Sequence, residues 1–202
     1  MSATQLLNLL RIHKLRIFTT RDIITLTDRT QTAVTQSLYR LEKQGMLMRI
    51  KRGVWVNKLI ANFNPFEAVP YLTAPSPAYL SLYSALADYG VVEEIPHIIY
   101  AVTAHLPKKY STPAGTFHIH HLNKRLIWGY EVKQLHEGSY PIADPEKAFL
   151  DLVYLSLVPR SPIQRVHKRS KKWKLNLGKL KEYAEKFEYP PLTRYLEKAG
   201  LV

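Results

Sequence analysis

The residues of this chain best suited to chemistry are the polar side chains of one short stretch near its N-terminus. Residues 31–40 offer amide, hydroxyl, phenol and guanidinium groups and no carboxylate. Such groups read base edges and phosphates when a helix lies in the major groove of DNA. One face of a helix would carry Gln31, Thr32, Thr35, Gln36, Tyr39 and Arg40. The stretch therefore predicts a contact with nucleic acid.

A helix must position these side chains, and its start, buried face and end can be predicted. Thr30 suits the N-cap, because its hydroxyl can accept a hydrogen bond from a first-turn amide. Val34, Leu38 and Leu41 follow at helical spacing and place an apolar stripe on the opposite face. Gly45 ends the helix, since glycine takes the left-handed conformation without penalty.

The flanking segments complete a DNA-binding motif. A short helix is predicted over 20–26, followed by a tight turn, with Arg29 just before the longer helix and aimed at a phosphate or a base. Two strand-like runs, 46–50 and 54–56, enclose a turn whose tip carries Lys51 and Arg52. Cations at the tip of a hairpin suit flanking phosphates or the minor groove. The order predicts a winged helix-turn-helix.

Composition narrows the class of protein. A chain of 202 residues, 46% of them hydrophobic, can bury one mid-sized core or two small ones. The absence of cysteine excludes disulfides, thiolate zinc sites and cysteine nucleophiles. The N-terminus lacks the pattern of a secretory signal, and no apolar run approaches a membrane span. We therefore expect a soluble, cytoplasmic protein.

The net charge of +13 is unevenly distributed. Residues 1–60 and 139–202 are basic, whereas 61–138 are close to neutral. A polyanion contacted by both ends is the simplest explanation, because neutralising phosphates releases counterions. An anionic membrane would fit the charge too, but no basic amphipathic helix with large aromatic anchors is evident.

A second basic run extends from Arg160 to Lys174 without an acidic residue. Two interpretations stay open: a solvated loop, or a second phosphate-contacting patch in which Trp173 stacks or anchors the segment. The patch would comprise Arg165, Lys168, Arg169, Lys171, Lys172 and Lys174.

The remaining chain predicts an α+β protein with the winged helix-turn-helix at 1–58, a linker at 59–69 and a C-terminal domain at 70–202. Prolines punctuate the linker region. Short β-branched runs at 98–104, 116–122 and 126–130 predict a small antiparallel meander. Helices are predicted over 78–89, 142–155, 177–187 and 192–199.

Candidate catalytic and metal-binding residues have simpler explanations. Asp144-Pro-Glu-Lys147 is similar in residue types to a nuclease set, but it suits a capped helix start, with Asp144 as the cap. His118 and His120 would share one face of a strand as a ligand pair, yet no third ligand is evident. No phosphate-binding loop or catalytic triad can be placed. We predict no enzyme activity, no metal and no cofactor.

The second half resembles a known family. The residues that carry the resemblance are 78–90, Thr103, Gly115-Thr-Phe117, Gly129-Tyr130 and, most specifically, Ile142-Ala-Asp-Pro-Glu-Lys-Ala-Phe-Leu-Asp-Leu152. Together with the winged helix-turn-helix they resemble the AbiEi-type antitoxins of type IV toxin-antitoxin systems, over nearly the whole chain. Members often carry an acidic residue where Tyr83 stands here.

The resemblance implies a repressor that binds its own operon promoter through the N-terminal domain. The C-terminal domain would oppose a nucleotidyltransferase-like toxin without forming a stable complex with it, in a system that serves phage defence. In this interpretation Arg29, Lys51 and Arg52 hold the phosphate backbone. Two alternatives remain: a solitary winged-helix regulator whose C-terminal domain senses a ligand or partner, and an RNA-binding module suggested by the basic run.

Overall fold

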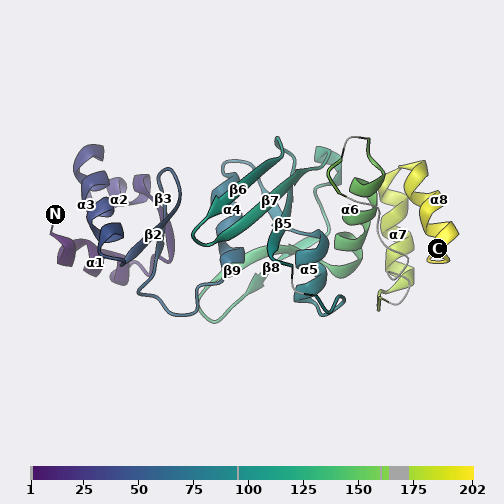
Figure 1. The fold of residues 1–202 in the computed structure, drawn as a ribbon, viewed down its shortest axis with the longest axis horizontal. Coiled ribbons are helices and arrows are strands. Elements are labelled where there is room, and N and C mark those ends of the chain that lie inside the picture. Colours follow the sequence, from purple (N-terminus) through teal and green to yellow (C-terminus); the bar gives the residue numbers. More distant parts are fainter. Residues whose placement is uncertain (1, 95, 160, 164–172) are drawn as a thin grey trace.

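The computed structural model describes residues 2–94, 96–159, 161–163 and 173–202. The molecule is elongated, with N-terminal helices at one end, C-terminal helices at the other, and a large sheet between them (Figure 1). None of the helices within the described ranges is long and apolar enough to cross a membrane.

The N-terminal part combines helices with a small antiparallel sheet. Its helices are α1 (Ala3–Ile12), α2 (Thr20–Thr27) and α3 (Gln31–Lys43). The strands are β1 (Ile17–Thr19), β2 (Leu47–Lys51) and β3 (Val54–Asn57), in the spatial order β1-β3-β2. The predicted elements are therefore present, and α3 ends before Gly45, which has the expected positive φ of 74°.

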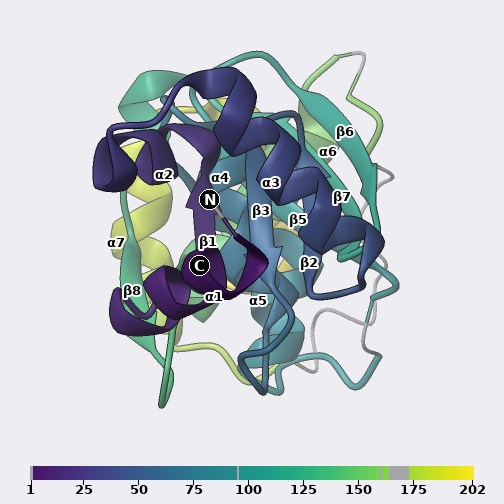
Figure 2. The same cartoon turned by 90° about the vertical axis from the view of Figure 1, so that its left-hand side faces the viewer.

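Both faces of the small sheet are covered. Trp55 points into a core formed with α1, α2 and α3, where Leu6 and Leu38 are also buried. Its neighbours Val54 and Val56 point the other way and join the core of the C-terminal part, because successive side chains of a strand alternate between faces. Seen from the N-terminal end, the small sheet lies in front of the large one (Figure 2).

The C-terminal part contains a six-stranded mixed sheet in the order β6-β7-β5-β4-β9-β8. Its strands are β4 (Ala78–Leu80), β5 (Ile98–Thr103), β6 (Lys108–Thr112), β7 (Gly115–His121), β8 (Tyr130–Gln134) and β9 (Ser139–Ala143). The predicted small antiparallel meander was wrong, because β5 pairs with β7 and β4 with β9 in parallel. Short strands look alike in sequence, whereas their order depends on distant pairing partners.

Two predicted elements in this part are also corrected. Residues 78–89 do not form one helix: 78–80 form β4, which pairs with β5, and α5 begins only at Leu82 and ends at Asp88. The strand predicted over 126–130 is replaced by the short 3-10 helix η2 (Lys124–Leu126) and the start of β8. Long-range strand pairing overrides the local preferences of these segments.

Among the described residues, three helices form the far end of the molecule. They are α6 (Pro145–Leu157), α7 (Leu177–Phe187) and α8 (Pro190–Ala199). Helix α6 starts at Pro145, directly after β9, and Asp144 caps it by accepting a hydrogen bond from the Lys147 amide at 2.9 Å. The predicted cap is thus confirmed, and α7 has the predicted bounds.

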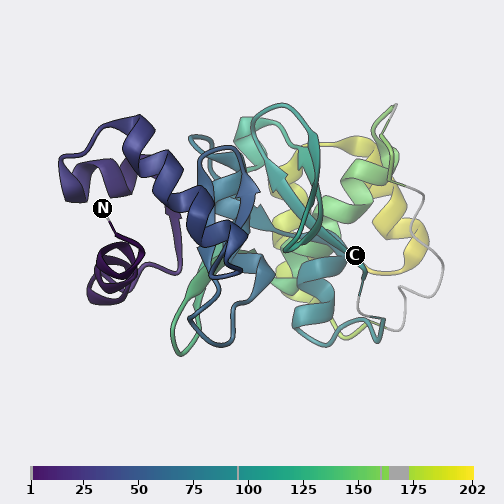
Figure 3. The same cartoon turned by 60° about the vertical axis from the view of Figure 1, so that its left-hand side comes forward.

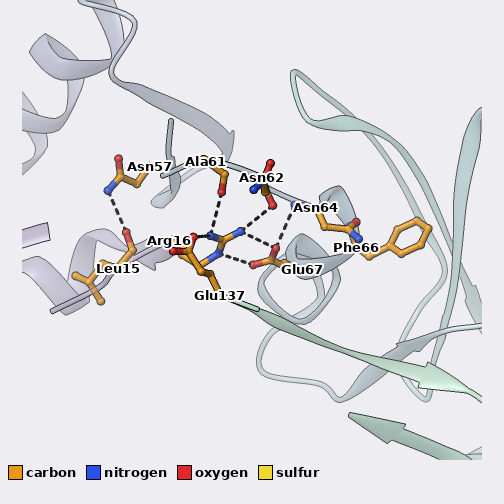
Figure 4. A network of polar contacts seen from close by, with 9 residues as sticks. All are labelled: Leu15, Arg16, Asn57, Ala61, Asn62, Asn64, Phe66, Glu67 and Glu137. Carbon is orange, nitrogen blue, oxygen red and sulfur yellow. Dashed lines mark hydrogen bonds and ion pairs between the residues drawn. The ribbon is translucent and has the colours of Figure 1, made fainter. Parts of the chain in front are cut away.

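The chain passes between the two parts through the 3-10 helix η1 (Pro65–Ala68) and the helix α4 (Val69–Thr73). Arg16 ties the parts together: its guanidinium bonds both carboxylate oxygens of Glu67 at 3.0 Å and one of Glu137 at 3.2 Å (Figure 4). The same group donates to the backbone carbonyls of Ala61 and Asn62. This network joins β1, η1 and the turn between β8 and β9.

Candidate nucleic-acid interface

Helix α3 has one buried and one exposed face, as its spacing predicts. Val34, Leu38 and Leu41 are buried against α1 and α2. Thr35 is half-buried, and the exposed polar residues are Gln31, Thr32, Gln36, Tyr39 and Arg40. The structure therefore brings all the predicted base-reading candidates to one surface of α3, which lies at the N-terminal end of the molecule (Figure 3).

Local hydrogen bonds set the geometry of α2 and α3. Thr19 caps α2 in a reciprocal arrangement with Asp22, and each side chain bonds the other residue's amide. Asp28 ends α2 in the left-handed conformation, and the Thr30 hydroxyl then accepts from the Ala33 amide to begin α3. The tight connection between the two helices leaves Arg29 exposed beside the first turn of α3.

Tyr39 is more engaged than its sequence position suggests. Its ring packs edge-on against Trp55 with centroids 5.4 Å apart, and its hydroxyl accepts a hydrogen bond from Arg49 at 2.6 Å. The Arg49 guanidinium also lies over the ring, 5.2 Å from the centroid. Tyr39 thus fastens α3 to the small sheet, which makes it a positioning residue as well as a surface one.

The two cations predicted at the tip of the hairpin between β2 and β3 differ in their exposure to solvent. Arg52 is exposed at the tip, next to Gly53, whose φ of 76° gives the turn its shape. Lys51 is half-buried, and its ammonium donates to the Leu72 carbonyl at 2.9 Å. Burial, with the nearby Lys108 charge, lowers the pKa of Lys51. Arg52 is therefore the better placed of the two for a phosphate.

Sequence reasoning missed two cations on β6. Lys108 and Lys109 are exposed on this edge strand of the large sheet. Lys108 and Lys51 line a common cleft of about 390 Å³ beside the hairpin of β2 and β3, and the Tyr110 hydroxyl donates to the same Leu72 carbonyl at 2.8 Å. The sequence feature that could have indicated these cations is the complete absence of acidic residues between Glu94 and Glu131. Nothing in the sequence, however, places β6 beside β2.

The second basic patch falls largely outside the described residues. Arg165, Lys168, Arg169, Lys171 and Lys172 belong to the undescribed range, and Lys174 is exposed. Trp173 packs edge-on against Phe149 and Tyr83, with centroids 5.7 and 6.4 Å away. Of the two roles predicted for Trp173, its contacts show anchoring.

The Asp144-Pro-Glu-Lys147 segment is occupied by structural contacts. Asp144 and Glu146 both lie within ion-pair distance of Lys179, at 3.1 and 3.4 Å. Lys147 is buried and pairs with Asp151. Each charged side chain of the segment therefore has a described partner that accounts for it.

The histidines of β7 face Tyr100 of β5. His118 and His120 share this side, with ring centroids 5.9 and 6.0 Å from Tyr100. His120 is 5% exposed, and its Nε2 has no hydrogen-bond partner among the described residues. Burial lowers the pKa of His120 to about 4, assisted by His118 and Lys109. In the described ranges, no three potential ligands gather to hold a metal ion.

Because His120 is buried, we expect the free energy of unfolding of the protein to fall in mild acid. The unfolded chain protonates this histidine near its ordinary pKa of 6.5, whereas the folded protein does so only at about 4. Between these values the unfolded state binds more protons, so the free energy of unfolding falls as the pH is lowered, by up to about 3 kcal/mol. Urea unfolding at a series of pH values measures this slope.

The control is His120→Phe, which keeps a ring beside Tyr100 and removes the titrating group. We expect this variant to show a flatter dependence on pH over the same window. Equal slopes in the two proteins would assign the acid sensitivity to other groups.

Comparison with known proteins bears on the N-terminal part. No curated protein matches the chain. Residues 5–58 match the family described as "Transcriptional regulator, AbiEi antitoxin". The match begins within α1 and ends just after β3, so it includes α2, α3 and the turn with Arg52. The resemblance to the AbiEi antitoxin family of transcriptional regulators is thereby confirmed for residues 5–58.

Proposed function

We propose that this protein is a DNA-binding transcriptional repressor that regulates its own operon and acts as the antitoxin of a type IV toxin-antitoxin pair. One observation carries the proposal: the exposed polar face of α3 and the exposed Arg52 of the hairpin both lie within the segment that matches the AbiEi regulators. Such a protein would act on DNA in the cytoplasm and need no cofactor or catalytic residue.

In this proposal the N-terminal part is a winged helix-turn-helix over residues 1–58, with 59–69 as linker and 70–202 as the antitoxin domain. Helix α3 enters the major groove, and the hairpin of β2 and β3 forms the wing. Arg29 and Arg52 contact phosphates, with Lys51 adding charge beside them. Bases are read by Gln31, Thr32, Thr35, Gln36 and Arg40, with Tyr39 at the edge of the interface.

Because base contacts and phosphate contacts are assigned to different residues, we expect substitutions in the two sets to have different effects on binding. Gln36→Ala or Thr32→Ala should reduce discrimination between the native upstream DNA and a shuffled duplex, by about 1–3 kcal/mol per lost base contact. Arg52→Ala should weaken both duplexes alike and lower the slope of log affinity against log salt by about 1. Lys51→Ala should lower that slope less, because its ammonium is held by the Leu72 carbonyl.

The measurement is a binding titration on both duplexes across a salt series, with Lys198→Ala on α8 as the matched control for loss of a distant surface cation. Discrimination that survives both changes on α3 would show that this helix does not read the bases. Equal binding of native and shuffled DNA by the unaltered protein would overturn the repressor proposal itself. A preference for structured RNA at equal salt would favour the RNA-binding alternative.

We further propose that β6 extends the interface beyond the wing. Lys108 is exposed, free of acidic neighbours in sequence, and lines the cleft that also contains Lys51. Replacing Lys108 by alanine should lower the salt slope by about 1 and shorten the protected DNA footprint on the wing side. A slope and footprint like those of Lys198→Ala would confine the interface to residues 1–58.

The antitoxin assignment is tested through the second gene of the operon. We propose a nucleotidyltransferase-like toxin as the functional partner, opposed without a stable complex. Co-expression should restore growth to cells that make the toxin, while the two purified proteins elute separately in gel filtration. Specific DNA binding without any rescue of growth would instead support a solitary regulator.

A further inference from the structure

An open cleft of about 770 Å³ lies where α1 meets the end of β3 and the turn between β8 and β9. One face of α1 forms a wall with Leu7 and Arg11, and the segment after β3 contributes Leu59. This volume falls within the range of sites for small organic ligands, about 300–1,000 Å³. None of the contacts already described for DNA uses this cleft.

The cleft and the proposed wing lie at opposite ends of the small sheet. In the pairing of β1 with β3, Thr19 lies opposite Val54, next to the wing turn, while Ile17 lies opposite Val56. Asn57, which lines the cleft, follows Val56 and is therefore at the end remote from Arg52. A ligand here would not occupy the surface assigned to DNA.

Positive charge dominates the lining. Arg11, Lys14 and Arg16 share the lining with Glu137, the single acidic residue among the described residues of the cleft. Arg16 is committed to Glu67 and Glu137 (Figure 4). Arg11 donates only to the side-chain oxygen of Asn8, at 3.0 Å, and within the described chain neither Arg11 nor Lys14 forms an ion pair. Two exposed cations thus remain available to an anion.

Apolar surface lies beside these cations. Leu59 is 61% exposed, and Leu7 and Ile60 are half-buried in the same lining. Exposed leucine gains from being covered by an apolar body, while a charged head gains from Arg11 and Lys14. A ligand that satisfies both features is amphipathic and anionic.

We propose that this cleft binds a small amphipathic organic anion, with its carboxylate or sulfonate head between Arg11 and Lys14 and its apolar body on Leu7 and Leu59. The size of the cleft suits a small molecule better than a macromolecule, whose contacts need a far larger buried area. Arg16 acts as a fixed part of the wall, since its donors are already used by Glu67, Glu137 and two carbonyls.

The test uses anilinonaphthalene sulfonate, a fluorescent probe with an apolar ring system and one negative charge, on the full chain. We expect saturable binding to one site, displaced by decanoate, a carboxylate with a plain apolar chain. The uncharged analogue phenylnaphthylamine should bind at least about tenfold more weakly, a difference of one decade in Kd. Circular dichroism of the same samples confirms that the probe reports on the native fold.

Variants locate the site. Arg11→Gln combined with Lys14→Asn should weaken sulfonate binding about tenfold and leave binding of the uncharged analogue unchanged. Asparagine suits position 14, whose φ of 49° is left-handed. Leu59→Ser should weaken both probes, and Lys181→Gln on α7 serves as the distant control. Unsaturable binding, or binding unaffected by the Arg11 and Lys14 changes, would overturn the proposal.

Discussion

Replacing Lys147 by methionine is expected to lower the free energy of unfolding by about 3–5 kcal/mol, the range for breaking a buried ion pair. Lys147 and Asp151 are both completely buried and lie one turn apart on α6, joined by an ion pair. The methionine keeps most of the volume and removes the cation. Asp151 is then left as a buried carboxylate with only hydroxyl partners, from Ser81 at 2.8 Å and Tyr79 at 3.2 Å.

The surroundings explain why this pair has to remain complete. The Lys147 ammonium donates to the Tyr79 hydroxyl at 2.9 Å and lies within 5.5 Å of the ring centroids of Tyr79, Trp128 and Phe187. Burial lowers the pKa of Lys147 and raises the pKa of Asp151, because removal from water penalises each charged form. Each charge therefore depends on the other.

A double variant distinguishes the effect of an unpaired buried charge from the effect of altered packing. Lys147→Met combined with Asp151→Leu removes both charges, so most of the loss should be recovered. Urea denaturation gives the free energies, and Lys186→Met, at an exposed pair with Glu182, is the control that should change little. If Lys147→Met alone were as stable as the wild-type protein, the buried pair would contribute nothing to the fold.

Replacing Arg16 by methionine is the second substitution with a large expected effect. We expect it to lower the free energy of unfolding by about 3 kcal/mol, the lower end of the range for breaking a buried ion pair. Glu67 is only 5% exposed and would lose a two-point contact with the guanidinium. It keeps the Asn64 amide as a donor at 3.1 Å, which limits the cost. The hydrogen bond with Glu67 raises the pKa of Arg16, consistent with a favourable contact.

The location of Arg16 gives this prediction a second readout. Because the residue connects β1 to η1 and to the turn before β9, its loss should loosen the junction as well as lower stability (Figure 4). Limited proteolysis should then cut within 59–64 sooner than in the wild-type protein. Glu137→Gln is the matched control: Glu137 is 53% exposed at the rim, so its change should have little effect.

Arg16→Lys tests whether charge alone suffices. Lysine cannot form the planar two-point contact that the guanidinium makes with Glu67. We expect this variant to be less stable than the wild-type protein and more stable than Arg16→Met. Wild-type stability in the lysine variant would show that a single ion pair is enough at the junction.

The sequence by itself determined the local features of the candidate interface. The cap Thr30, the apolar stripe through Val34 and Leu38, and the helix end before Gly45 all appear as predicted. These features depend on contacts within about four residues along the chain, which spacing alone can specify. The family match at 5–58 covers most of this same region.

Tertiary structure decided the order of the strands and the partners of the buried charges. Arg16 meets Glu67 and Glu137 across 51 and 121 residues, and Lys51 meets the Leu72 carbonyl across 21. No local pattern distinguishes a parallel pair such as β5 and β7 from a hairpin, or a lysine in the core from one at the surface. Such contacts form only when distant segments pack together, because side chains then gain the burial and partners that their own neighbours cannot provide.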